Sequence, residues 1–127
     1  MTVITFGIMK YQVYIEDFII SVSPAADFSE AKITVKVKII NSSGKISDSE
    51  TVRVWIKGEN SLGEPIEIVL NEHLHIDSVS VNTLSTILFN PVLWTTEKPY
   101  FYKGKLELLD EEEKIIESYD FNLCVKQ

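Results

Sequence analysis

Acidic side chains are the first candidates for chemistry in this chain, because two carboxyl groups held close together can serve as a general acid and a general base. Glu16 and Asp17 are neighbours, but successive side chains of a strand point to opposite faces. The run from Glu111 to Glu113 lies in a predicted turn, where solvent would surround each carboxyl group. We therefore expect a solvated acidic turn and no catalytic pair.

Two histidines, His73 and His75, are the candidates for a metal site, with Glu72 and Asp77 close to them in the sequence. Side chains two residues apart on a strand share a face, so the two imidazoles could point the same way. A zinc site needs at least one further convergent ligand, and this spacing alone is a weak signal. The sequence favours two surface histidines in a connection, with no metal and no cofactor.

Cys124 is the single cysteine, which excludes an internal disulfide bond. No histidine lies near it in the sequence to activate the thiol as a nucleophile. It falls in a β-rich pattern, where a small buried thiol is the ordinary arrangement. The sequence also contains no glycine-rich phosphate loop and no Ser-His-Asp arrangement.

The net charge of −7 indicates which partners this chain would avoid. A negative field repels phosphate backbones and anionic lipids, so we expect no nucleic-acid partner and no membrane partner. No apolar run is long enough to span a bilayer. Residues 1–9 are apolar but have no basic n-region and no small-residue cleavage site, which predicts a cytoplasmic chain, although a parent protein could carry a signal.

The elements that would position these side chains are strands, because the dominant hydrophobic period is two. Apolar and polar residues alternate through residues 33–39, 52–56, 66–70 and 105–108. The last segment is expected to place one set of side chains on a single face. This set is Ile115, Tyr119, Phe121, Leu123 and Val125. Such half-buried strands each have a core-facing side and a wet side.

Irregularities and turns complete the pattern. The segment 12–22 changes parity at Glu16-Asp17, which predicts a β-bulge or a strand that crosses between sheets. Turn clusters lie at 41–44, 58–65 and 110–114, and residues 27–31 could form one helical turn. The sequence therefore predicts an all-β protein, an immunoglobulin-like β-sandwich of about seven antiparallel strands.

The segment 90–102 is the most informative stretch, because two prolines bracket a tryptophan and an aromatic strand follows. It resembles the Pro-x-Leu-Trp-Ser-x-Glu-x-Pro-x-Leu-Tyr signature of the immunoglobulin-like domain in glycoside hydrolase family 2, the family of the large β-galactosidases, β-glucuronidases and β-mannosidases. The positions that carry the resemblance are Pro91, Leu93, Trp94, Glu97, Pro99, Tyr100 and Tyr102. The segments 13–18, 36–44 and 106–118 are also similar to strands of that domain.

The resemblance implies a β-galactosidase-like parent protein whose domains have different roles. Residues 1–11 would be an N-terminal lead-in, and residues 12–127 would form the immunoglobulin-like domain. In this family two glutamates on the barrel carry out retaining glycoside hydrolysis, so this domain would be a non-catalytic spacer between a sugar-binding jelly roll and the barrel. Residues 120–124 depart from the usual Arg-Phe-Gly-Phe-Arg of relatives and keep only Phe121.

Aromatic side chains leave an alternative function open. Trp94, Tyr100 and Tyr102 could stack on sugar rings, but a tryptophan in a proline-bounded crossover favours a corner-packing role. Trp55 lies on the face opposite Val54 and its apolar neighbours, so it is either exposed or covered by a neighbouring domain. We therefore carry a second hypothesis, a stand-alone carbohydrate-binding or adhesion module with weak sugar contact.

Overall fold

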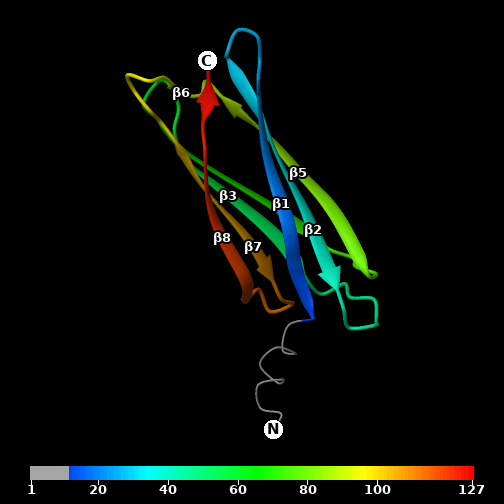
Figure 1. Cartoon of the computed structure of the whole chain (residues 1–127). Coiled ribbons are helices and arrows are strands. Elements are labelled where there is room, and N and C mark those ends of the chain that lie inside the picture. Colours follow the sequence, from blue (N-terminus) through cyan, green and yellow to red (C-terminus); the bar gives the residue numbers. More distant parts are fainter. Residues whose placement is uncertain (1–11) are drawn as a thin grey trace.

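The computed structural model describes residues 12–127, and this part of the chain contains strands and no helix. Nine strands follow one another along it (Figure 1). Their bounds are β1 Val13–Pro24, β2 Glu30–Asn41, β3 Thr51–Glu59, β4 Pro65–His73, β5 Val79–Phe89, β6 Leu93–Trp94, β7 Tyr102–Leu109, β8 Ile115–Leu123 and β9 Val125–Lys126. The expected lead-in, residues 1–11, and the stretch tested for a signal peptide, residues 1–9, lie outside the described residues.

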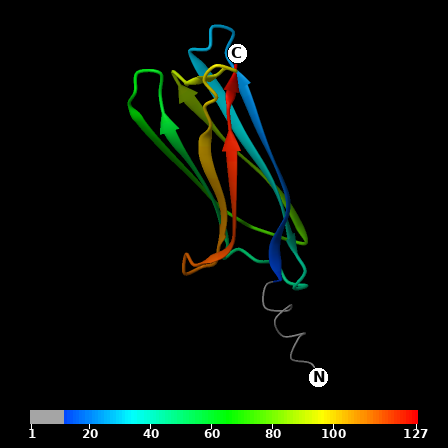
Figure 2. The ribbon, with the colours of Figure 1, turned by 60° about the vertical axis from the view of Figure 1, so that its left-hand side comes forward.

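Seven long strands form two antiparallel sheets that face each other (Figure 2). The three-stranded sheet has the order β1-β2-β5, and the four-stranded sheet has the order β4-β3-β7-β8. The short strands β6 and β9 form a separate parallel pair. Here β4 lies beside β3, whereas the immunoglobulin constant-type arrangement places the fourth strand beside the fifth. The predicted all-β sandwich is confirmed.

The predicted irregularity in the first strand is a bulge in β1. Ile15 pairs with Ile39 and Asp17 pairs with Lys38, so Glu16 is an extra residue without a partner in β2. The extra residue moves the core-facing positions of β1 from odd to even numbers. The parity change in the sequence therefore arises from one inserted residue.

The connection between β1 and β2 is a tight turn, and residues 27–31 do not form the helical turn that the sequence left open. Phe28 has a φ of 59°, which lies in the left-handed region. The Asp27 carboxylate accepts hydrogen bonds from the hydroxyl and the amide of Ser29, at 2.7 and 3.0 Å. These two bonds lower the pKa of Asp27. An aspartate carboxylate that accepts a hydrogen bond from the residue two positions later stabilises a turn, and no helix is needed.

The core lies between the two sheets and is filled by alternate residues of each strand, as the period of two predicts. Enclosed side chains include Ile33, Val35, Val37, Ile39, Val52, Val54, Ile56, Leu106 and Leu108. The intervening residues of β2 and β3 face outward. The faces of the sandwich are therefore set by the sequence pattern, and outward side chains such as Trp55 must find partners on the surface of a sheet.

One core-facing position in the last hairpin differs from the prediction. Ile115 is 53% exposed, while the adjacent Ile116 packs against the core. The register between β7 and β8 shifts between Leu108 and Leu109, opposite this point. The irregularity reverses the alternation at the start of β8, so Ile115 turns outward. Tyr119 is also 40% exposed.

Cys124 is half-buried and not fully enclosed as expected. Its neighbours Leu123 and Val125 occupy the core-facing positions, so the thiol takes the other side of the strand. Within residues 12–127, no helix has the length and apolar character needed to cross a membrane.

The two ends of the described chain lie at opposite ends of the sandwich (Figure 1). β1 begins at one end of the long axis, and β9 finishes at the other. The reason is topological: the chain crosses the molecule once in each of seven long antiparallel strands, and an odd number of crossings separates start from finish.

Candidate functional site

The first candidate region is the end of the signature, which we call the tyrosine corner: Gly58, Glu59, Val92, Tyr100 and Tyr102. The Tyr102 hydroxyl donates to the backbone oxygen of Glu59 at 2.6 Å and accepts from the amide of Val92 at 2.9 Å. The Tyr100 hydroxyl accepts from the amide of Glu59 at 2.7 Å. The two rings meet edge to face, with centroids 5.0 Å apart. The corner thus ties the β5–β7 crossover to the end of β3.

Two further observations show how tightly the corner is packed. Tyr102 is fully buried, and burial raises the pKa of its hydroxyl. A Cβ added to Gly58 would come within 2.4 Å of the Tyr102 ring and 2.8 Å of the Tyr100 hydroxyl oxygen. Glycine is required there because the rings occupy the space of a side chain.

Leu93 and Trp94 form β6, which pairs in parallel with Val125 and Lys126 of β9. The Lys126 ammonium lies 5.0 Å from the centroid of the Trp94 ring. The indole Nε1 of Trp94 is enclosed and has no hydrogen-bond acceptor among the described residues. The ring is half-buried and covered on one side by a lysine, so it is not an open platform for a sugar.

The remaining signature residues divide between the interior and the surface. Pro91 is buried and forms an isolated bridge with Asn60. Glu97 and Pro99 are exposed in the loop before Tyr100. The Glu97 carboxylate accepts a long hydrogen bond of 3.3 Å from the hydroxyl of Thr96. The signature is therefore one continuous crossover whose first and last residues are packed and whose middle is in solvent.

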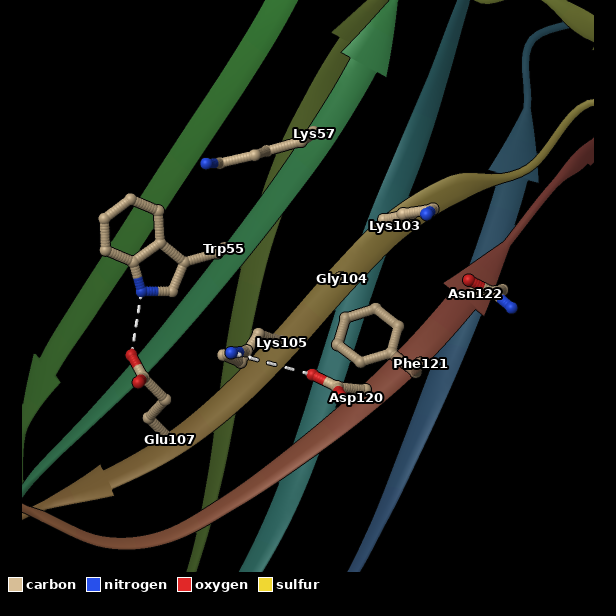
Figure 3. Close-up of a pocket in the computed structure, with 9 residues that line it drawn as sticks. All are labelled: Trp55, Lys57, Lys103, Gly104, Lys105, Glu107, Asp120, Phe121 and Asn122. Atoms are coloured by element: carbon tan, nitrogen blue, oxygen red, sulfur yellow. Dashed lines mark hydrogen bonds and ion pairs between the residues drawn. The ribbon is translucent and has the colours of Figure 1, made fainter.

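The second candidate region is a hollow of about 620 Å³ on the outer face of the four-stranded sheet (Figure 3), which we call the Trp55 hollow. It is lined by Trp55, Lys57, Lys103, Gly104, Lys105, Glu107, Asp120, Phe121 and Asn122. These residues come from β3, β7 and β8, which lie side by side. The volume falls in the range of small-molecule sites.

Glu107 fixes the orientation of Trp55. One oxygen of its carboxylate accepts hydrogen bonds from the indole Nε1 and from Nε of Arg53, both at 2.8 Å. Glu107 is only 4% exposed although it faces outward. The Arg53 guanidinium also lies 5.2 Å from the indole centroid. The sequence places Glu107 on a wet face, and no signal in it predicts that Arg53 and Trp55 would enclose this carboxylate.

Three lysines line the hollow, and Lys57 is the one that lies over the indole. Lys57 lies directly opposite Lys103 in the β3–β7 register, and the Lys57 ammonium is 5.6 Å from the indole centroid. Lys57 forms an ion pair with Glu67 at 3.3 Å, and Lys105 forms a long one with Asp120 at 3.8 Å. No ion pair involves Lys103 within residues 12–127.

Phe121 is the aromatic residue of the last strand that matches the family's usual motif. It packs directly on Gly104. The two residues are partners in the β7–β8 register, and a Cβ on Gly104 would lie 2.1 Å from the Phe121 ring. The ring fills the space left by the missing side chain and supports the sheet beneath the hollow.

The two histidines are exposed, as expected of surface residues. His73 is at the end of β4 and borders a smaller hollow of about 250 Å³ beside Asp110 and Glu111, and His75 follows in the connection to β5. In the described part of the chain no three His, Cys, Asp or Glu side chains converge as metal ligands would.

The acidic pairs considered for catalysis are apart and open to solvent. Glu16 forms an exposed ion pair with Lys38 at 2.9 Å, while the amide of Phe18 donates to the Asp17 carboxylate. Residues 111–113 are exposed in the β7–β8 turn. The buried carboxylates of the described chain are Glu50, held by serine hydroxyls, and Glu107.

A two-layer sandwich with a proline-bounded crossover fixed by a tyrosine hydroxyl defines an all-β sandwich domain. The family model described as Glycosyl hydrolases family 2 matches residues 13–123, and the chain belongs to this family. The β-galactosidase of Oenococcus oeni (strain ATCC BAA-331 / PSU-1) is 24% identical over 117 residues, which cover 90% of this chain and 11% of that protein.

Solved structures show the same fold. The β-glucuronidase of Parabacteroides merdae is 17% identical with a TM-score of 0.65, over 90% of this chain and 13% of that one. A putative β-galactosidase from Bacteroides fragilis is 25% identical with a TM-score of 0.63, over 90% of this chain and 16% of that one. The chain therefore spans roughly a tenth to a sixth of the length of these relatives.

Proposed function

We propose that residues 12–127 form a non-catalytic domain of a β-galactosidase-like glycosidase, and that residues 1–11 are its lead-in. The domain would act as a rigid spacer that positions a jelly-roll sugar-binding domain against a catalytic barrel. The parent protein would hydrolyse O-glycosidic bonds in carbohydrate metabolism. A cytoplasmic location of the chain stays a prediction.

The observation that carries the proposal is the separation of the two ends of the described residues, 12–127. The described residues begin at one end of the sandwich and finish at the opposite end (Figure 1). Neighbours joined at these points would be held apart by the full length of the strands. The strands are long and paired on continuous ladders, so the distance between the two ends is fixed by packed β-structure.

The carboxylates of the domain also support a non-catalytic role. Retaining hydrolysis needs two carboxyl groups about 5–5.5 Å apart on either side of the scissile bond. Glu107 is bound by Arg53 and Trp55, and Glu50 accepts hydrogen bonds from Ser47 and Ser49. Each buried carboxylate is thus engaged by its own partners.

Two experiments test the spacer. The isolated chain should not hydrolyse chromogenic galactosides, glucuronides or mannosides, and activity that persists through repurification would overturn the proposal. In the second experiment residues 13–123 replace the matching segment of the Oenococcus oeni β-galactosidase. A geometric spacer should preserve much of the activity, provided that gel filtration shows a folded chimera. A folded chimera with no activity would contradict the proposal.

A further inference from the structure

We infer that the free edge of β5 (Val79–Phe89) pairs with the same edge of a second copy of this chain, antiparallel and with the two Leu84 residues opposite each other. The inference goes beyond the spacer function, because it concerns how two copies associate in solution. Three features of β5 support it: an unpaired backbone edge, the lack of protection that the other edge strands have, and outward side chains that complement themselves.

One side of β5 is open. The strand is the last of the three-stranded sheet, and Figure 1 shows it along the margin of the molecule with β2 on its inner side. No strand other than β2 pairs with β5 within residues 12–127. In an antiparallel ladder alternate residues direct their N–H and C=O groups away from the neighbouring strand. These outward groups of β5 are therefore available to a further strand.

The other three edge strands have features that oppose pairing with another chain. β1 contains the bulge at Glu16 and ends at Pro24. β4 begins with Pro65 and contains two glutamates, and β8 contains Glu117 and Asp120. Proline, bulges and charges are the usual means by which edge strands avoid association. β5 has eleven residues, none of them charged or proline, and its register with β2 is continuous. Its edge is therefore the one suited to a partner strand.

The outward side chains of β5 favour a second copy as that partner. With the two Leu84 residues opposite each other, each outward residue meets the one equally far from Leu84 on the other copy. The resulting pairs are Val79–Phe89, Val81–Ile87 and Thr83–Ser85. Apolar side chains thus meet apolar ones and hydroxyls meet hydroxyls, which are pairs that stabilise a sheet. The four apolar members are 36–64% exposed in the single chain, so pairing removes apolar surface from water.

The charges on β2 do not oppose this arrangement. Lys38 lies beside Val81 in the β2–β5 register, and Lys32 lies beside Ile87. In the joined sheet these two lysines, from different copies, end a row with two apolar residues between them. Three strand spacings separate them by about 14 Å, which exceeds the screening length of about 8 Å at physiological salt. Their apolar stems can cover the paired side chains.

The extent of the edge sets the strength of the association. Pairing along one strand of eleven residues gives an interface at the low end of specific ones, below about 1,200 Å² in total. Main-chain hydrogen bonds supply much of the affinity in this kind of contact. Both copies use the same edge, so the association closes at two copies around a two-fold axis. We therefore expect a weak, reversible dimer.

The first test is sedimentation velocity of the full chain at concentrations from about 1 to 500 μM. We expect a monomer–dimer equilibrium with a dissociation constant of about 10–100 μM. Thr83→Lys places a charge at the centre of the edge in both copies and should weaken the dimer at least about tenfold. Ser21→Lys is the matched control, because Ser21 is exposed on the outer face of the same sheet but lies on β1. It should leave the dissociation constant within about twofold, and circular dichroism checks that both variants are folded.

The second test reads the register by cross-linking. Val81→Cys and Ile87→Cys are made separately, each in a chain that also carries Cys124→Ser and so has a single thiol. In the inferred register position 81 of one copy lies opposite position 87 of the other, with Cα atoms about 4.5–5.5 Å apart and within disulfide reach. Two copies of position 81 would be about 20 Å apart. Mild oxidation of the mixed variants should therefore give a mixed disulfide dimer by mass spectrometry, and each variant alone should not.

Four results would overturn the inference. The first is a chain that stays monomeric at about 500 μM, well above the expected dissociation constant. The second is equal weakening by Thr83→Lys and Ser21→Lys, which would place the contact away from β5. The third is a series of higher oligomers, which a two-fold contact does not form. The fourth is equal cross-linking in the mixed and single-variant samples. Hydrolysis assays play no part in these outcomes, so the spacer proposal is tested separately.

Discussion

The tyrosine corner and the Trp55 hollow share two strands, β3 and β7, but lie on opposite faces of the sheet. Inside, the hydroxyl of Tyr102 bonds to backbone groups of Glu59 and Val92. Outside, the carboxylate of Glu107 bonds to the side chains of Trp55 and Arg53. Polar groups in the first region fix the path of the chain, whereas those in the second fix the direction of a ring.

This difference implies unequal contributions of the two regions to stability. A buried hydroxyl that satisfies two backbone groups is costly to lose, because those groups would stay unpaired away from water. A ring oriented on an outer face contributes less to folding but presents a defined surface to solvent. Loss of the buried Tyr102 contacts in the corner should therefore reduce stability strongly, whereas loss of contacts in the hollow should reduce it less.

The largest effect is expected from Gly58→Ala. The added methyl group collides with the Tyr102 ring, which is enclosed and cannot retreat. Overpacking and loss of the hydroxyl's hydrogen bonds together should reduce the free energy of unfolding by about 3–5 kcal/mol. Urea denaturation followed by circular dichroism measures the change. A loss below about 1 kcal/mol would show that the packing around residue 58 can adjust. The corner would then not be the more sensitive of the two regions.

Tyr102→Phe should have the next largest effect. The ring remains, but the amide of Val92 and the backbone oxygen of Glu59 lose their partner. We expect a loss of about 2–3 kcal/mol in the free energy of unfolding. Tyr100→Phe is the matched control, because it removes a single bond at a half-buried position and should cost about 1 kcal/mol. Equal losses for the two variants would contradict the backbone-pairing role of Tyr102.

Glu107→Gln tests the outer region. The amide can still accept a hydrogen bond from one partner, but the charge that pairs with Arg53 is gone. We expect a loss of about 1–2 kcal/mol in unfolding free energy and a clear shift of the Trp55 indole N–H signal. An unchanged indole signal would show that Glu107 does not orient the ring.

Raising the pH above neutral should lower the free energy of unfolding through the corner, by less than the substitutions above. Burial raises the pKa of Tyr102 above its ordinary value of 10.0, so the folded state holds the phenolic proton more tightly than the unfolded state. Its contribution is fully present below about pH 10 and is lost as the pH rises through the folded-state pKa, with a slope of at most about 1.4 kcal/mol per pH unit for a single proton.

Urea unfolding between about pH 8 and 11 measures this slope, with Tyr102→Phe as the reference that lacks the ionisable group. The variant should have a flatter decline than the original chain. The pKa of Tyr119 is raised as well, chiefly by its hydrogen bond to Glu117, and this contribution cancels when the two curves are subtracted. Parallel curves would argue against a buried Tyr102 hydroxyl.

The smallest effect on stability is expected from Lys103→Gln. The side chain is exposed and has no ion pair within residues 12–127, so removal of its charge breaks no charged contact there. The free energy of unfolding should rise or stay within about 0.5 kcal/mol of the original. This result would sharpen the contrast between the two regions. A loss above about 1 kcal/mol would mean that Lys103 has a structural role.

Much of the fold could be predicted from the sequence, because each long strand has a buried face and a wet face. The period of two located the core positions of β2 and β3, and the parity change located the bulge at Glu16. The prediction was wrong for Ile115, because the register shift opposite it depends on how β8 meets β7. It was also wrong for Cys124, which is half-buried on the side away from the core.

The candidate sites were harder to predict from the sequence than the fold. The signature from Pro91 to Tyr102 was identified as a unit, since prolines and aromatics lie close together along the chain. Of the residues that line the hollow, the sequence singled out Trp55 and Phe121, and the charged members on β7 were missed. Glu107 and Lys103 come from a strand about fifty residues away, and no local pattern marks them as neighbours of the indole.

By itself, the sequence determined the alternation of faces, the turns and the proline-bounded crossover, because these depend on residues close together along the chain. Only the tertiary structure decided which distant strands lie side by side, and therefore that a carboxylate of β7 is enclosed by Trp55 and Arg53 of β3. The physical reason is that period-two alternation fixes the face on which a side chain lies, whereas strand order and register fix which side chains meet there.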